Sequence, residues 1–224
     1  GDGYRTNLIW YYNDFTIKNF SNGIPGDQDD PVRSATNCPL KNFMVSAAEI
    51  QAYKVLKDSD SNLARHALTM AQEDWKQAVL KEEEWMNDVG GHYRHHKNMN
   101  TGDLKPITGS EKEVGGGVGG AFIAAAWGII ATTELFEITQ DPIYKNKAIE
   151  YGRLLMRCQE QTFLHDVPIA GYFYTHPSKT IRVQDGNGGR SEVPINALSK
   201  LAKTFPDSGD WIEWYSSLLM HSEY

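Results

Sequence analysis

ATTELFEITQDPIYKNKAIEYGRLLMRCQEQ, residues 131–161, is the stretch that decides the fold. Its first part ends a long apolar helical pattern, its second part is amphipathic, and the two meet at Gln-Asp-Pro. Asp141 suits a helix N-cap, because its carboxylate can accept a hydrogen bond from a free N–H of the first turn. Pro142 suits the first helical position, where no N–H donor is needed. We therefore predict two antiparallel helices, over about residues 118–139 and 142–161, joined by a tight turn.

The same arrangement of two helices and a short turn occurs twice more in the chain. Apolar residues at helical spacing predict one pair before this hairpin and one pair after it. The pairs cover residues 40–57 with 62–85, joined by KDSDS, and residues 193–204 with 210–221, joined by FPDSGD. We expect an all-α domain of antiparallel hairpins over residues 38–224, preceded by an extended or β-like arm over residues 1–37.

Two long connections separate the three hairpins. Each contains about 30 residues, which is long for a compact domain and typical of functional loops. They include VGGHYRHHKN, residues 89–98, and FLHDVPIAGYFYTHPSKTIRVQDGNGGRSE, residues 163–192. Because antiparallel helices alternate in direction, the short turns should lie at one end of the helical array. Both long connections should then meet at the other end.

Composition excludes some classes of function. The chain has 29 acidic and 22 basic residues in 224, which argues against a surface for nucleic acid. The apolar run AFIAAAWGIIA, residues 121–131, is shorter than the roughly 18 residues of a membrane span, so we expect a buried helix and no membrane insertion. No targeting segment is recognisable at the N-terminus, which leaves the localisation open; a secreted or periplasmic protein is compatible with it.

The two cysteines, Cys38 and Cys158, form no metal-binding or redox motif. We expect buried free thiols, with one disulfide as the alternative. The histidines of VGGHYRHHKN lack the spacing of a helical zinc motif, so we predict no metal site and no cofactor.

The 131–161 stretch resembles the repeating hairpin of the six-hairpin glycosidases, in which a short turn with Asp-Pro-x-Tyr joins two helices. EVPINALSKLAKTFPDSGDWIEWYSSLLMHSEY, residues 192–224, is similar to a further hairpin of the same superfamily. The resemblance covers residues 38–224 and lies in the regular succession of helical hairpins. It implies part of an (α/α)6 toroid, whose remaining half would come from the parent chain. It also implies a carbohydrate-active enzyme, a glycoside hydrolase acting on an oligo- or polysaccharide.

Glycoside hydrolysis generally uses two carboxyl groups, separated by roughly 5 to 9.5 Å. GDQDDP, residues 26–31, resembles the Asp-x-x-Asp cluster of cellulase-type inverting enzymes, which makes Asp27 and Asp30 candidates to activate water. Asp166 and Glu192 are further catalytic candidates, because both lie in the second long connection. Glu192 could instead be an acid that stabilises a helix N-terminus.

Sugars pack their C–H faces on aromatic rings and need donors and acceptors around their rims. These needs give a set of candidate substrate-binding residues in the long connections: His92, Tyr93, Arg94, His95, His96, Tyr172, Tyr174, His176 and Arg190. Phe173, between the two tyrosines, is expected to pack in the core. We predict that Tyr93, Arg94, His95, Tyr174, His176 and Glu192 line a common cleft.

Two alternatives remain open. A polysaccharide lyase would use a Tyr and His pair to remove a proton next to a uronic acid, with Arg neutralising the carboxylate. A non-catalytic, glycan-binding helical scaffold would need no carboxylate at all.

Overall fold

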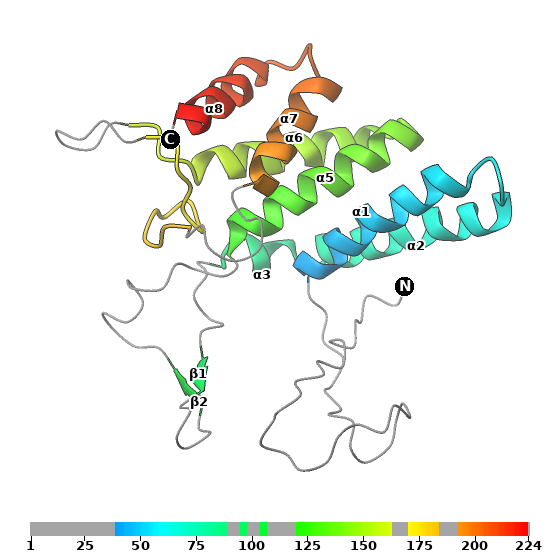
Figure 1. Cartoon of the computed structure of the whole chain (residues 1–224), viewed down its shortest axis with the longest axis horizontal. Coiled ribbons are helices and arrows are strands. Elements are labelled where there is room, and N and C mark those ends of the chain that lie inside the picture. The colour runs from blue at the N-terminus through cyan, green and yellow to red at the C-terminus, as the bar shows by residue number, and fades with distance from the viewer. Residues whose placement is uncertain are drawn as a thin grey trace.

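The computed structural model describes residues 39–88, 95–97, 104–106, 120–162, 170–183 and 192–223. These residues are mostly helical (Figure 1), as the all-α prediction required. The helices are α1 (Pro39–Leu56), α2 (Ser61–Val79), α3 (Glu82–Met86), α5 (Ala121–Thr139), α6 (Pro142–Arg157), α7 (Glu192–Thr204) and α8 (Trp211–Glu223). Two short strands, β1 (His95–Lys97) and β2 (Leu104–Pro106), pair antiparallel.

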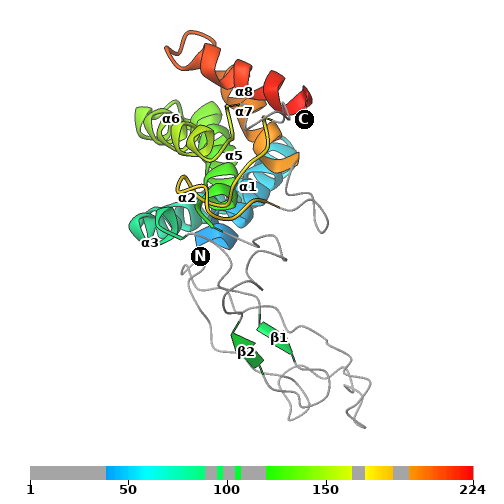
Figure 2. The ribbon, with the colours of Figure 1, turned by 90° about the vertical axis from the view of Figure 1, so that its left-hand side faces the viewer.

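The helices form three antiparallel hairpins, α1/α2, α5/α6 and α7/α8, at the predicted places (Figures 1 and 2). The first helices of the hairpins pack against one another, with α5 between α1 and α7. Of the 19 residues of α5, 13 are buried, which explains why its sequence is apolar on every side. By length and composition alone α5 could cross a membrane, but 72% of its apolar window is buried inside the protein, as in the core helix of a globular domain.

Aspartate side chains cap the N-termini of the second helices in two hairpins. Asp60 Oδ1 accepts hydrogen bonds from the backbone N–H groups of Asn62 (3.1 Å) and Leu63 (3.0 Å) at the start of α2. Asp141 Oδ1 accepts one from Ile143 N–H (2.9 Å), with Pro142 as the first residue of α6. Both caps satisfy N–H groups that the helix itself leaves free.

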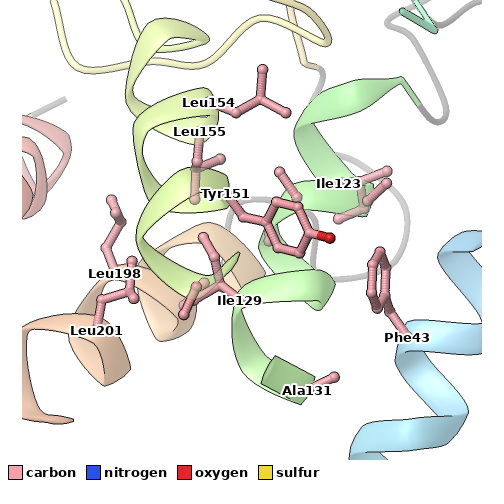
Figure 3. Close-up of a cluster of buried hydrophobic side chains, with 14 of the residues drawn as sticks. Phe43, Ile123, Ile129, Ala131, Tyr151, Leu154, Leu155, Leu198 and Leu201 are labelled. Atoms are coloured by element: carbon pink, nitrogen blue, oxygen red, sulfur yellow. The ribbon is translucent and has the colours of Figure 1, made fainter. Parts of the chain in front are cut away.

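Tyr151 of α6 lies at the centre of the core (Figure 3). Its ring makes edge-on contacts with Phe43 at a centroid distance of 5.8 Å and with Trp85 at 5.2 Å. The hairpins approach closely here, since a Cβ atom at Gly128 of α5 would lie 3.0 Å from the Tyr151 ring. The Tyr151 hydroxyl donates to Glu82 Oε1 (2.5 Å), so the ring joins α6 to α3 as well as to α1 and α5.

The predicted helix over residues 62–85 is wrong in one respect, because it is broken at Leu80 and Lys81 into α2 and α3. The break turns Trp85 into the core, where it is only 5% exposed. It also brings Glu82 to Lys147 of α6, whose ammonium group donates to Glu82 Oε2 (2.6 Å). Tertiary contacts thus decide the path of the chain where helical periodicity alone would continue it.

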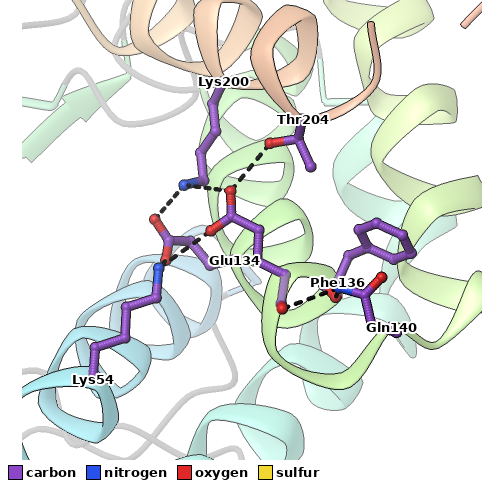
Figure 4. Close-up of polar contacts among 7 residues, drawn as sticks. Lys54, Glu134, Phe136, Gln140, Lys200 and Thr204 are labelled. Atoms are coloured by element: carbon purple, nitrogen blue, oxygen red, sulfur yellow. Dashed lines mark hydrogen bonds and ion pairs between the residues drawn. The ribbon is translucent and has the colours of Figure 1, made fainter. Parts of the chain in front are cut away.

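Glu134 of α5 joins three hairpins near their short turns (Figure 4). Its carboxylate pairs with Lys54 of α1 and with Lys200 of α7, the latter at 2.5 Å. Only 8% of the Glu134 side chain is exposed. Burial alone would raise the pKa of Glu134, but hydrogen bonds and charge from the two lysines outweigh it and hold the pKa below the ordinary value of 4.5.

This pKa predicts an acid-dependent loss of stability through Glu134. A group with a lowered folded-state pKa contributes stability that is present above its unfolded-state pKa and lost as the pH falls through the folded-state pKa. We expect Glu134→Gln to destabilise the protein at neutral pH, and the difference from wild type to shrink below the ordinary value of 4.5. Denaturant unfolding across pH measures this. Glu213→Gln, at an exposed position of α8, serves as the control, and an equal pH profile for both variants would contradict the prediction.

Candidate functional site

Three extended segments form a small layer at one end of the helices, and we name it the platform: residues 158–160, 172–175 and 181–183. The first two are joined by Glu160 N–H donating to Tyr172 O (2.8 Å) and Tyr174 N–H donating to Cys158 O (2.8 Å). The last two are joined by Val183 N–H donating to Phe173 O (2.9 Å). The predicted helix 142–161 is therefore too long, because α6 ends at Arg157 and the chain after it pairs as a strand.

The platform lies where the two long connections meet. Phe122 N–H, in the first turn of α5, donates to Thr175 O (3.0 Å) of the second connection. Ala121 N–H donates to Asp88 O (2.9 Å) at the beginning of the first connection. In Figure 1 this end of α5 lies opposite the turns that join α1 to α2 and α5 to α6. The prediction that the long connections converge is confirmed for their described ends.

One face of the platform packs on the helices. Phe173 lies in the core, with its ring centroid 5.3 Å from that of Phe122 and 5.4 Å from that of His221, as predicted for this residue. Gln159, opposite Phe173, donates from Nε2 to the carbonyl oxygens of Gly171 (3.0 Å) and Ser217 (3.0 Å). The bond to Ser217 joins the platform to α8.

Gly171 allows this close approach to α8. Its φ is +93°, and a Cβ atom there would lie 2.1 Å from Met220 O, a backbone atom that cannot rotate away. We expect Gly171→Ala to lower the free energy of unfolding by about 2–3 kcal/mol, through backbone strain and overlap. Denaturant unfolding measures this, with Gly209→Ala as the control, since nothing lies within 4 Å of a Cβ at Gly209. Equal stability of the two variants would contradict the close approach.

The other face of the platform carries Glu160, Tyr172 and Tyr174, because alternate residues of an extended segment point to opposite faces. The Tyr174 hydroxyl donates to Glu160 Oε2 (3.2 Å) and lies 3.2 Å from the Tyr172 hydroxyl. Lys179 Nζ donates to Glu160 Oε1 (3.3 Å). Thr162 donates to the same oxygen from its hydroxyl (2.7 Å) and its backbone N–H (3.2 Å). Glu160 is only 4% exposed, yet both of its carboxylate oxygens have partners.

The contacts fix the protonation of this face. Burial acts to raise the pKa of Glu160, but the Thr162 hydrogen bonds and the Lys179 charge outweigh it and keep the pKa below its ordinary value. Burial, followed by Tyr172 and then by the Glu160 carboxylate, raises the pKa of Tyr174 to about 12. Near neutral pH the pair is therefore a carboxylate beside a protonated phenol.

A tight turn and the platform segment after it supply the two cations, Lys179 and Arg182. Lys179 N–H donates to His176 O (3.0 Å), and Lys179 has a φ of +55°, which is uncommon for a residue with a side chain. The ammonium group of Lys179 lies 5.9 Å from the Tyr174 ring centroid, and the Arg182 guanidinium lies 4.9 Å from that of Tyr172. We call Glu160, Tyr172, Tyr174, Lys179 and Arg182 the Glu160 cluster.

The predicted site residues fall into four groups. Tyr172 and Tyr174 are brought together in the Glu160 cluster, where they are 6% and 7% exposed. His176 lies in the adjoining turn, where its Nδ1 accepts from Ser178 N–H (3.0 Å), and Glu192 is the exposed first residue of α7. His95 and His96 belong to strand β1. Outside the described residues lie Asp27, Asp30, His92, Tyr93, Arg94, Asp166 and Arg190.

The sequence did not identify Glu160 as a site residue, because its position continues the helical pattern of residues 142–157. The available signal was the run Tyr172–Tyr174, whose aromatic residues favour a strand and therefore require a partner strand nearby. Cys158, also after the end of α6, is a buried free thiol, as predicted. Burial raises the pKa of Cys158 to about 12, which keeps the thiol protonated near neutral pH. Cys38 lies outside the described residues.

Within the described part of the chain, no three His, Cys, Asp or Glu side chains are grouped closely enough to hold a metal ion. Comparison with family models and with curated proteins gives no match.

Proposed function

We propose that the protein is a carbohydrate-active enzyme, a glycoside hydrolase in which Glu160 is a catalytic carboxylate. One observation carries the proposal: a nearly fully buried carboxylate, paired with an ammonium group and two hydroxyls, lies where the long connections meet. Carboxylates are seldom buried unless they are paired, and groups with a shifted pKa are more frequent at functional sites. Glu160 differs from Glu134, which is also buried and paired, in lying at the long-connection end of the helices. The same proposal takes the three hairpins as part of an (α/α)6 toroid, with its long-connection end forming the substrate side.

The ionisation of Glu160 suits one of the two roles in glycoside hydrolysis. A carboxyl group that remains charged can act as a nucleophile or as a base that removes a proton from water. The proton donor would be a second acid, and Asp27, Asp30, Asp166 and Glu192 remain our candidates for it. Tyr172 and Tyr174 would support the sugar and donate hydrogen bonds.

The protonation of Tyr174 favours hydrolysis over elimination by a tyrosine base. A lyase needs a base that removes a carbon-bound proton, and a tyrosine in that role must give up its own proton first. The Tyr174 hydroxyl donates to a carboxylate, and its pKa is raised to about 12, which opposes ionisation. Within the Glu160 cluster, the carboxylate is thus the better base.

The test is to incubate the full chain with a panel of neutral and acidic oligosaccharides. Release of reducing ends without ultraviolet absorbance is the expected result. Absorbance from an unsaturated product would show a lyase and overturn the proposal. Saccharide binding without turnover at any pH would overturn it in favour of a glycan-binding scaffold.

A further inference from the structure

Arg182 is the one cation of the Glu160 cluster for which no carboxylate partner is seen among the described residues. Its side chain is exposed, and its guanidinium lies over the ring of the buried Tyr172, 4.9 Å from the centroid. A cation–π contact with an aromatic ring restrains a guanidinium without using its N–H groups, which can still donate hydrogen bonds. Arg182 is therefore held ready to bind a planar, negatively charged group.

The charges of the Glu160 cluster also favour the binding of an anion by Arg182. The Glu160 carboxylate alone would repel an anionic ligand, but Lys179 pairs with it at 3.3 Å and offsets its charge. Arg182 then supplies an excess positive charge on this face of the platform. The backbone of Arg182 pairs with that of Tyr174, and Lys179 lies in the turn between them. The Lys179 ammonium group contacts Glu160, and the Arg182 guanidinium contacts Tyr172.

We propose that Arg182 binds the carboxylate of a uronic acid, so that the substrates are acidic oligosaccharides. This inference rests on the proposed function, which it deepens by naming the substrate class. A carboxylate matches the flat fork of a guanidinium in a bidentate arrangement, in contrast to a hydroxyl group of a neutral sugar. Arg182 is connected to Glu160 through two tyrosines. The hydroxyl groups of Tyr172 and Tyr174 are in contact, and Tyr174 donates to Glu160. Arg182 would thus hold the sugar by its acid group while Glu160 acts at the glycosidic bond.

The experiment compares a charged ligand with its uncharged counterpart. Calorimetry would measure binding of oligogalacturonate and of its methyl ester to the Glu160→Gln, Lys179→Met protein, in which turnover is suppressed and both charges of the Glu160–Lys179 pair are removed together. The ester keeps the sugar and removes only the charge. The same titrations on this protein with Arg182→Met added isolate the contribution of Arg182, and Arg182→Lys tests whether charge alone suffices. Arg65→Met, at an exposed position of α2, is the matched control.

We expect oligogalacturonate to bind about 10–100-fold more tightly than the ester, as charge-assisted hydrogen bonds do in general. Arg182→Met should abolish this preference, Arg182→Lys should retain part of it, and Arg65→Met should leave it unchanged. Equal affinity for the two ligands, a preference that survives Arg182→Met, or no binding of either ligand would overturn the inference.

Activity of the wild-type protein separates this inference from the proposed function. Hydrolysis of neutral oligosaccharides but not of oligogalacturonate would refute the role of Arg182 and leave the hydrolase standing. An Arg182-dependent preference for the charged ligand, without hydrolysis of it by the wild type, would refute the hydrolase and keep the binding site.

Discussion

Replacement of Glu160 by glutamine is expected to lower the rate of glycoside hydrolysis by about 10²–10⁴-fold, the usual contribution of a general base. Glutamine has nearly the same shape, and its one amide oxygen can still accept from Thr162. It has no negative charge, however, to take a proton or attack a sugar. Initial rates of reducing-end release measure the effect. Circular dichroism and thermal unfolding would establish that the variant is folded.

The matched control is Glu150→Gln, which removes an acid from α6 whose side chain is 48% exposed. Its rate should equal that of the wild type. A Glu160→Gln variant that is folded and fully active would exclude Glu160 from the reaction.

The pH profile provides an independent check. Because the pKa of Glu160 lies below its ordinary value of 4.5, the acid limb of the rate profile should lie below that value as well. Lys179→Met removes a charge that lowers this pKa, so the limb should move to higher pH. A residue with a purely structural role would change the rate or the stability but would leave the limb in place.

Replacement of Tyr151 by alanine is expected to lower the free energy of unfolding by about 3–5 kcal/mol, as removal of a buried aromatic ring does elsewhere. The ring is fully buried between Phe43 and Trp85, so its loss leaves a cavity where three hairpin helices and α3 meet. Denaturant unfolding monitored by tryptophan fluorescence measures the change.

Two further variants separate the contributions of Tyr151. Tyr151→Phe keeps the ring and loses only the hydrogen bond to Glu82, so it should cost about 1–3 kcal/mol. Tyr215→Ala removes an exposed tyrosine that stacks on Trp211 of α8 and should cost below about 1.5 kcal/mol. If Tyr151→Ala were no more destabilising than Tyr215→Ala, the core could not be centred on Tyr151.

Local chemistry made the hairpins predictable. The caps at Asp60 and Asp141 lie where free N–H groups must be satisfied, and helical periodicity identified the segments between them. The expectation that the long connections meet at one end of the helical array followed from the alternation of short and long connections. These features depend on residues near one another in the sequence, which is why no structure was needed to find them.

The two wrong boundaries share a physical cause. The break at Leu80 and the early end of α6 at Arg157 both occur where contacts with distant residues outweigh helical propensity. At Leu80 the competing contacts are those of Trp85 in the core. After Arg157 they are backbone hydrogen bonds to residues 172–174.

The candidate site was predicted only in part for the same reason. Tyr172 and Tyr174 were identified as aromatic residues of a long connection, but their partner Glu160 was assigned to a helix. Arg182 carries no motif that distinguishes it from other surface arginines. Its significance depends on its cation–π contact with Tyr172, which is a property of the folded chain alone.

The bonds from Gln159 and His221 that tie the platform to α8 have a thermodynamic consequence. A ligand that stabilises the platform must also oppose the opening of α8, since the two share these bonds and the close approach at Gly171. Amide hydrogens in the last turns of α8 should therefore exchange with solvent more slowly when the Glu160 cluster is occupied. By the reciprocity of linked equilibria, any partner that pulls α8 away would weaken ligand binding by the same factor.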